Sequence, residues 1–150
     1  MTSKEYIMHQ QRSRKWEACL YSIARELEAQ LDQSQLIILM RGAGERMAQG
    51  FPELQMETLD DVEAVINDVW KESDWGWVKF SEEKDIVKIE HHFSPLKAAL
   101  GEPSKDWGLA LLEGFYTKVF QQLGAAPELA VRQVSVSDDD GITTFNLCVA

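Results

Sequence analysis

Cysteine and long apolar runs are scarce in this sequence, and each shortage narrows the kinds of protein it can be. The two cysteines, Cys19 and Cys148, lie near opposite ends of the chain and form no CxxC pair, so we expect reduced, packed thiols. No run of about 18 apolar residues occurs. The opening residues MTSKEYIMHQQRSRKW lack the apolar core of a secretory signal. We therefore expect a cytoplasmic protein without direct membrane insertion.

Basic residues are also few, since 15 lysines and arginines face 25 acidic residues and leave a net charge of −10. Such a surface opposes binding to a phosphate backbone, so we expect no nucleic-acid partner. The one basic cluster, at Arg12, Arg14 and Lys15, is interpreted as the solvated face of a helix. With 150 residues and 45% hydrophobic content, the chain is long enough for one domain over 1–150.

Sequence patterns for catalysis are missing. The glycines within 42–50 match neither GxGxxG nor a Walker loop and follow a helical pattern. His91 and His92 are adjacent in a predicted strand, so their side chains face opposite ways and do not share a metal. Glu113 lies in the most apolar helix, where we expect a hydrogen bond between helices or subunits. We therefore predict no catalytic residue, no metal, no cofactor and no enzymatic activity.

Apolar spacings of three and four predict three helices in the first half of the chain. The first covers about the first thirty residues, and the second follows DQSQ at 32–35 and stops around Gly50 and Pro52. Glycines 42 and 44 in the second helix are expected to allow a close backbone approach. Thr58 is predicted to cap the third helix. The second helix is predicted to bury one side, formed by Leu36, Leu39, Met40, Ala43, Met47 and Phe51.

The second half of the chain alternates between strand and helix patterns. GWVKF and DIVKIEHHF form one predicted hairpin, and the segment 130–150 forms another around Asp140-Gly141. Between them lie a short helix or turn ending at Leu100 and a long helix over 105–123. We predict an α+β fold in which N-terminal helices pack on a roughly four-stranded antiparallel sheet, with the long apolar helix between two β-hairpins. That helix is apolar around much of its circumference, which places it in the centre of the domain or in an oligomer interface, and we favour the interface in a small domain.

Three stretches carry a family resemblance when taken together: GERMAQGF at 44–51, WGWVKF at 75–80 and GEPSKDWGLALLEGFYTKVF at 101–120. In order and spacing they resemble the bacterial cellulose synthase D subunit. We call the residues that carry the resemblance the signature residues and interpret them as mostly structural or interface positions. They are Gly44, Met47, Ala48, Phe51, Trp75, Gly76, Trp77, Gly101, Glu102, Pro103, Trp107, Glu113, Gly114 and Tyr116.

The resemblance implies a non-catalytic accessory subunit that assembles from dimers into an octamer. Such a scaffold would organise cellulose synthase complexes or nascent β-1,4-glucan chains for ordered secretion. The implied partners are further copies, other cellulose synthase or secretion subunits and glucan chains. A guide for secreted glucan would also fit the periplasm, which is the alternative to the cytoplasmic location.

Two alternatives concern the aromatic residues and the fold. Trp75 and Trp77 either stack on sugar rings or anchor the first strand, and we favour the anchoring role. The order of elements also resembles the 4-vinyl reductase family of small-molecule sensor domains, in which the final strand often carries a cysteine, as Cys148 does here.

Overall fold

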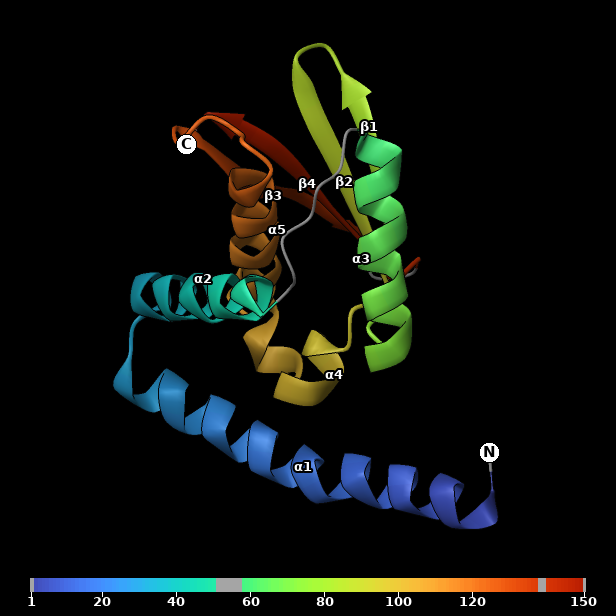
Figure 1. Ribbon diagram of the computed structural model, residues 1–150. Helices are drawn as coiled ribbons and strands as arrows, with labels where there is room; N and C mark the ends of the chain where they lie inside the picture. Colours follow the sequence, from blue (N-terminus) through green and yellow to red (C-terminus); the bar gives the residue numbers. More distant parts are fainter. Residues whose placement is uncertain (1, 51–57, 138–139, 150) are drawn as a thin grey trace.

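A four-stranded sheet with helices on one face forms the body of the protein (Figure 1). The computed structural model describes residues 2–50, 58–137 and 140–149, without the side chains of residues 5–15 and 137. Phe51 and the side chains of the basic cluster lie outside this part. The described elements are α1 (Ser3–Gln30), α2 (Gln33–Gln49), α3 (Leu59–Ser73), β1 (Trp77–Glu83), β2 (Ile86–His92), α4 (Leu96–Leu100), the 3₁₀ helix η1 (Glu102–Asp106), α5 (Ala110–Gln122), β3 (Leu129–Ser137) and β4 (Ile142–Val149).

The sheet confirms the predicted α+β class. Its strand order is β1-β2-β4-β3, and all neighbouring strands are antiparallel, so each predicted hairpin is present and the two hairpins meet at β2 and β4. The first hairpin turns at Lys84 and Asp85, both with positive φ, as a two-residue hairpin turn requires. Strand β1 continues through Ser81, Glu82 and Glu83 up to this turn.

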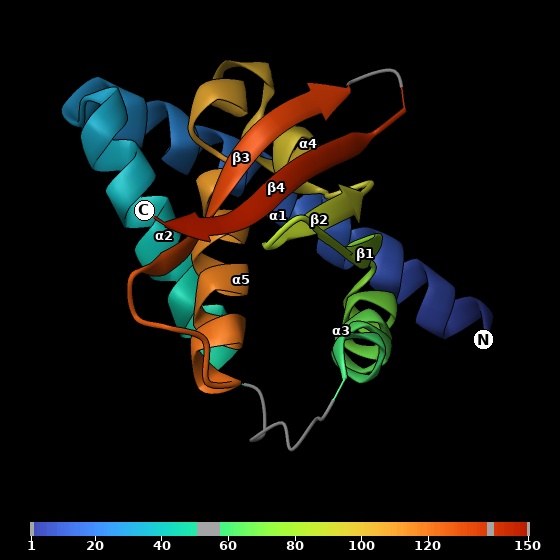
Figure 2. The same cartoon turned by 90° about the horizontal axis from the view of Figure 1, so that it is seen from above.

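One face of the sheet carries the core. Pairing places Phe80, Ile89 and Phe145 in one row, and all three are buried. Figure 2 shows α5 and α3 beneath this same face, with α2 on the far side of α5. The opposite face has no helix over it in either view of the described residues.

Helix α5 is the central element of the molecule. From Ala110 to Phe120 all its residues are buried except Lys118, because α2 packs on one side and the sheet on the other. Its central place accounts for its apolar circumference, so the preference for an oligomer interface at this helix was wrong. The predicted start at residue 105 was also wrong, because η1 and a turn occupy the chain up to Leu109.

Two glycines let α2 and α5 touch backbone to backbone. A Cβ at Gly44 would overlap the carbonyl oxygen of Leu111, and a Cβ at Gly114 would overlap that of Arg41. Gly42 has open space around its Cα, so the close approach expected there was wrong.

The buried side of α2 also differs from the predicted one. It follows Leu36, Met40, Gly44 and Ala48, whereas Leu39 and Met47 are exposed. A crossing centred on Gly44 turns this i, i+4 row toward α5 and rotates the other apolar residues outward.

Caps fix the ends of α2 and α3. Asp32 accepts a hydrogen bond from Gln35 N at 2.9 Å, and the side chain of Gln35 accepts one from Asp32 N at 3.0 Å. Thr58 accepts a hydrogen bond from Asp61 N at 3.1 Å, which confirms the predicted cap. Among the described helices, none has the combination of length and apolar character that crossing a bilayer requires.

Candidate functional site

Helix α1 is held to the body through its C-terminal half. Arg25 Nη2 donates hydrogen bonds to Glu28 Oε1 and to Leu100 O, both at 2.8 Å. The same Glu28 oxygen accepts a hydrogen bond from Trp107 Nε1 at 3.1 Å. A signature tryptophan thus fixes α1 against α4 and η1.

Gly101 provides the second contact that seats α1. Its φ of +92° suits glycine, and a Cβ there would meet Arg25 Nη1 at 2.7 Å and Tyr21 Cε2 at 2.7 Å. Arg25 also stacks on the Tyr21 ring, with 4.7 Å between its Cζ and the ring centroid. The signature stretch at 101–107 therefore forms the seat of α1.

The apolar side of α1 is largely uncovered by the rest of the described chain. Ala24 is fully buried, but Trp16 is 61% exposed and Ile23 is 50% exposed. We call the uncovered residues the α1 stripe, which consists of Trp16, Leu20, Tyr21 and Ile23. Figure 1 shows the N-terminal half of α1 extending away from the other helices. Helix α1 thus presents large apolar side chains to its surroundings.

A buried chain of hydrogen bonds links α3, α5 and β2. Trp70 Nε1 donates to Tyr116 Oη at 3.0 Å, and Tyr116 Oη lies 2.6 Å from His91 Nδ1. His91 Nε2 lies 2.8 Å from Trp75 O, which can only accept. His91 therefore carries its proton on Nε2, and Nδ1 accepts from the tyrosine hydroxyl.

Burial controls the ionisation of this chain. It lowers the pKa of His91 to about 4, despite the hydrogen bond to Trp75 O that raises it. Burial also raises the pKa of Tyr116 well above its usual value. Both groups are neutral near pH 7, so the pair is a satisfied polar contact within the core.

Glu113 joins α2, α5 and β3. Its Oε1 accepts a hydrogen bond from Arg41 Nε and pairs with Arg41 Nη2, both at 3.1 Å. Its Oε2 accepts from Gln133 N at 2.8 Å. The bond lies between helices of one chain, which is one of the two fates expected for this carboxylate.

The two signature tryptophans around Gly76 have different surroundings. Trp75 is half-buried and stacks on Trp70 with 5.3 Å between ring centroids and 14° between planes. Trp77 is 49% exposed and stacks on His92 at 5.2 Å and 11°. Gly76, with a φ of +77°, separates them, and a Cβ there would overlap His92 O. Trp75 anchors the strand as expected, whereas Trp77 is the centre of an exposed cluster that also includes Phe93.

The remaining signature residues lie apart from these contacts. Ala48 is buried against α5, and Met47 is exposed. Glu102 pairs with Lys97 at 3.1 Å on the surface, and Pro103 lies in the first turn of η1. The signature residues thus form several contacts and no single centre within the described part of the chain.

Sequence reasoning missed the helix side chains that cover the edge of β1. Asn67 exchanges two hydrogen bonds with the backbone of Val78, at 2.9 and 2.7 Å, and Glu63 Oε1 accepts from Phe80 N at 2.7 Å. The signal was present, because Glu63 and Asn67 are four apart and flank the buried stripe of α3.

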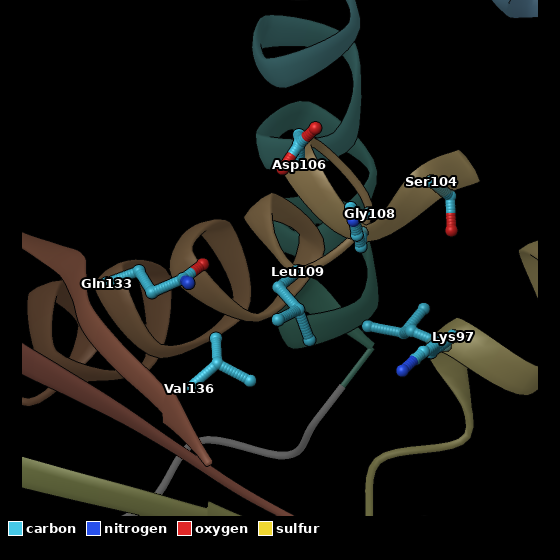
Figure 3. Close-up of a pocket in the computed structure, with 9 residues that line it drawn as sticks. Lys97, Ser104, Asp106, Gly108, Leu109, Gln133 and Val136 are labelled. Carbon is cyan, nitrogen blue, oxygen red and sulfur yellow. The ribbon is translucent and has the colours of Figure 1, made fainter. Parts of the chain in front are cut away.

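A groove of about 210 Å³ lies between β3 and the segment from α4 to the start of α5 (Figure 3). Lys97, Asp106 and Leu109 line it from the helical side. Gln133 and Val136 line it from β3.

Side chains suited to metal binding or thiol chemistry are spread over the molecule. Within residues 2–50, 58–137 and 140–149, no three or more His, Cys, Asp or Glu side chains are placed to hold a metal ion. Both cysteines are free, as expected, but Cys19 is exposed rather than packed and Cys148 is partly exposed.

The fold and these contacts define a small α+β protein whose helix α1 is seated on the body by a signature turn. A family model for the cellulose synthase D subunit matches residues 2–146. The chain therefore belongs to the cellulose synthase D subunit family, which is involved in cellulose synthesis, and the resemblance inferred from the sequence is confirmed.

Curated relatives agree with this assignment. The chain is 29% identical over 110 residues to cellulose synthase operon protein D of Komagataeibacter xylinus. This alignment covers 71% of this chain and 70% of the relative. It is also 29% identical over 104 residues to the protein of the same name in Komagataeibacter sucrofermentans, covering 67% of each chain. The family match favours this assignment over the sensor-domain alternative.

Proposed function

We propose that the protein is a non-catalytic accessory subunit of bacterial cellulose synthesis that acts as a self-assembling scaffold. Copies associate through the α1 stripe and build an octamer from dimers. The assembly arrays synthase complexes, so that nascent β-1,4-glucan chains emerge close together and crystallise. Other cellulose synthase or secretion subunits are its partners, in keeping with the operon that the names of its relatives record.

The uncovered α1 stripe is the observation that carries this proposal. Apolar side chains on a flexible tail could collapse onto the body, but α1 is fixed by the contacts of Arg25, Glu28 and Trp107. Covering such a surface with a second copy gains free energy of about 25 cal/mol per Å² of apolar area removed from water. Closed symmetric assembly is the usual way in which identical chains cover such surfaces.

Sedimentation velocity of two matched variants tests the proposal. Ile23→Glu places a charge in the α1 stripe, and Ile38→Glu places the same charge on α2, where Ile38 is 69% exposed. We expect the association constant of the first variant to fall by at least about tenfold, because the new charge must lose its hydration when two copies associate. The second variant should assemble like the wild type. Equal assembly of both variants would contradict a role for the stripe.

A guide that binds glucan directly is the second candidate function. The exposed ring of Trp77, held by His92 and next to Phe93, favours it because flat aromatic faces can pack on sugar rings. Titration of the assembled protein with cellopentaose, followed by calorimetry, tests it. Binding that is lost in Trp77→Ala and kept in Phe80→Leu would support the guide, and no heat above dilution would count against it.

The compartment stays a prediction. We propose the cytoplasmic side, where the synthase can be arrayed before the glucan leaves the cell. Protease protection of the tagged protein in intact and permeabilised cells checks this, and digestion in cells with only the outer membrane opened would favour the periplasm.

A further inference from the structure

Side chains from two helices cover most of the sheet's free edges. On β1, the outward N–H groups of Val78 and Phe80 bond to Asn67 and Glu63 of α3. A strand edge with free N–H and C=O groups is a template for pairing with another chain, and covering it prevents such pairing.

The first half of β3 is covered in the same way by α5. Val131 N donates to Thr117 Oγ1 at 2.8 Å, and Gln133 N donates to Glu113 Oε2 at 2.8 Å. Thr117 is held in turn by its bond to Glu113 O at 2.6 Å. These contacts occupy the outward N–H groups of β3 as far as Gln133.

A bulge then changes the strand. The pairing shifts between Gln133 and Ser135, which leaves Val134 as the extra residue. Beyond it, Ser135 pairs with Thr144 and Val136 with Thr143. Alternate residues of β4 direct their backbone N–H and C=O groups toward β3, and Thr144 and Asn146 are two of these residues. Val136 pairs with Thr143, the neighbour of Thr144, so the N–H and C=O of Val136 point away from β4.

The edge beyond the bulge combines backbone and apolar surface. Val134 is 58% exposed and Val136 is 44% exposed, which is unusual for a strand edge that is not paired. Val136 also lines the groove between β3 and α4, with Leu109 opposite it (Figure 3). A second hollow continues the groove past Val136 toward Phe93 and Thr143.

We propose that the β3 edge at residues 134–136 and the adjoining groove bind an extended segment of another protein, which adds to the sheet as a short fifth strand. Such an edge spans about 10 Å, enough for three residues of a partner strand. A peptide suits this edge because its own N–H and C=O groups repeat at the spacing of a strand. The inference rests on the sheet edge and is independent of self-assembly through α1.

The lining of the groove indicates which peptide would fit. An apolar side chain, preferably β-branched, would pack between Val136 and Leu109. Two lysines, Lys97 and Lys105, and one acid, Asp106, line the first hollow, so a single carboxylate two residues away along the peptide suits that end, where it would join the pair of Lys97 with Glu102. The partner segment is therefore extended, with an apolar residue and an acidic residue two positions apart on the face that meets the groove. A second copy pairing edge to edge is the alternative occupant, and the mass of the assembly tests it.

Selection from a display library of random octapeptides, performed on the full-length assembled protein, provides the probe. We expect enriched peptides in which an apolar residue and an acidic residue lie two positions apart. Each enriched peptide is then resynthesised with single N-methyl groups, because methylation removes one peptide N–H at a time. Methylation at alternate residues should weaken binding by at least about tenfold, and methylation at the residues between should change it less than about threefold.

Two protein variants locate the site. Val136→Pro removes the outward N–H and should abolish peptide binding, while Val136→Thr keeps the N–H and should bind within about threefold of wild type. Slower hydrogen exchange of the Val136 amide on peptide addition provides the same information without any substitution. Absence of enriched peptides, equal binding to Val136→Pro, or equal effects of all N-methyl positions would overturn the proposal. A fall in the mass of the assembly with Val136→Pro alone would assign the edge to a second copy and also overturn it.

Discussion

The surroundings of α5 and the surface of α1 differ in how far the chain itself provides partners for polar groups and cover for apolar side chains. Around α5, the buried hydroxyl of Tyr116, the ring of His91 and the carboxylate of Glu113 all have partners, and the apolar side chains are covered. On α1, polar contacts hold one half of the helix, but the α1 stripe stays exposed. The core around α5 is therefore satisfied within the chain, whereas α1 leaves large apolar side chains exposed.

The largest effect is expected where α2 and α5 touch. Gly114→Val places two methyl groups against the Arg41 carbonyl, so the helices must separate, and we expect a loss of about 4 kcal/mol or more in unfolding free energy. Gly42→Ala is the matched control, because its new methyl meets open space and alanine favours the helix by about 1 kcal/mol. Urea denaturation at a fixed protein concentration measures both, and equal stability of the two variants would contradict the crossing.

Acid should weaken the body through His91. In the unfolded chain its pKa is about 6.5, while burial holds it at about 4 in the folded protein. Between these values the unfolded state binds more protons, so stability falls as pH falls through this window, by roughly 3 kcal/mol in total. Denaturation at pH 7, 6 and 5 measures the loss. The pKa of the Glu90 carboxyl is lowered from 4.5 by its hydrogen bond to Lys88, so Glu90 adds a loss of the same sign that sets in mainly below pH 5.

A specific control isolates the histidine. His91→Asn has no titratable ring and should show a flatter profile between pH 7 and 5, although it is less stable throughout. A wild-type profile as flat as that of the variant would mean that His91 is not held neutral by burial.

Removing the central hydroxyl should have a smaller effect. Tyr116→Phe leaves Trp70 Nε1 and His91 Nδ1 without their partner, at a cost of about 2 kcal/mol. Tyr21→Phe, at a 47% exposed side chain, should change stability by less than about 0.5 kcal/mol. Thermal unfolding at one protein concentration compares them, and similar values for both would show that the buried chain of hydrogen bonds contributes little.

The smallest effect is expected at the exposed aromatic cluster. Trp77→Ala should lower stability by less than about 1 kcal/mol, because half of the ring already contacts water. Trp75→Ala, which removes the ring stacked on Trp70, should cost about 3 kcal/mol. Calorimetric unfolding compares the two, and a larger loss at Trp77 would reverse the anchoring assignment.

Local patterns in the sequence predicted most elements of the fold. Apolar periodicity located α1 and α3, alternation located both hairpins, and Thr58 marked the start of α3. These features depend on residues within a few positions of each other. The sequence therefore contained them without any knowledge of the tertiary structure.

Contacts between residues far apart in the sequence could not be predicted from these local patterns. The buried side of α2 depends on where Gly44 meets Leu111, and the pairing of His91 with Tyr116 depends on the sheet lying over α5. The apolar circumference of α5 was visible, but its cause was not, because a central helix and an interface helix have the same pattern. The contact of the signature residues Gly101 and Trp107 with α1 also required the structure.

Absolute molar mass by light scattering after size exclusion tests the central claim most directly. A scaffold assembled through the α1 stripe predicts a stable octamer, and eight chains of 17.1 kDa give 136.8 kDa. A single species near that mass across a hundredfold range of concentration would support the account. A monomer of 17.1 kDa over the whole range would contradict it, since the α1 stripe would then stay exposed without a second copy.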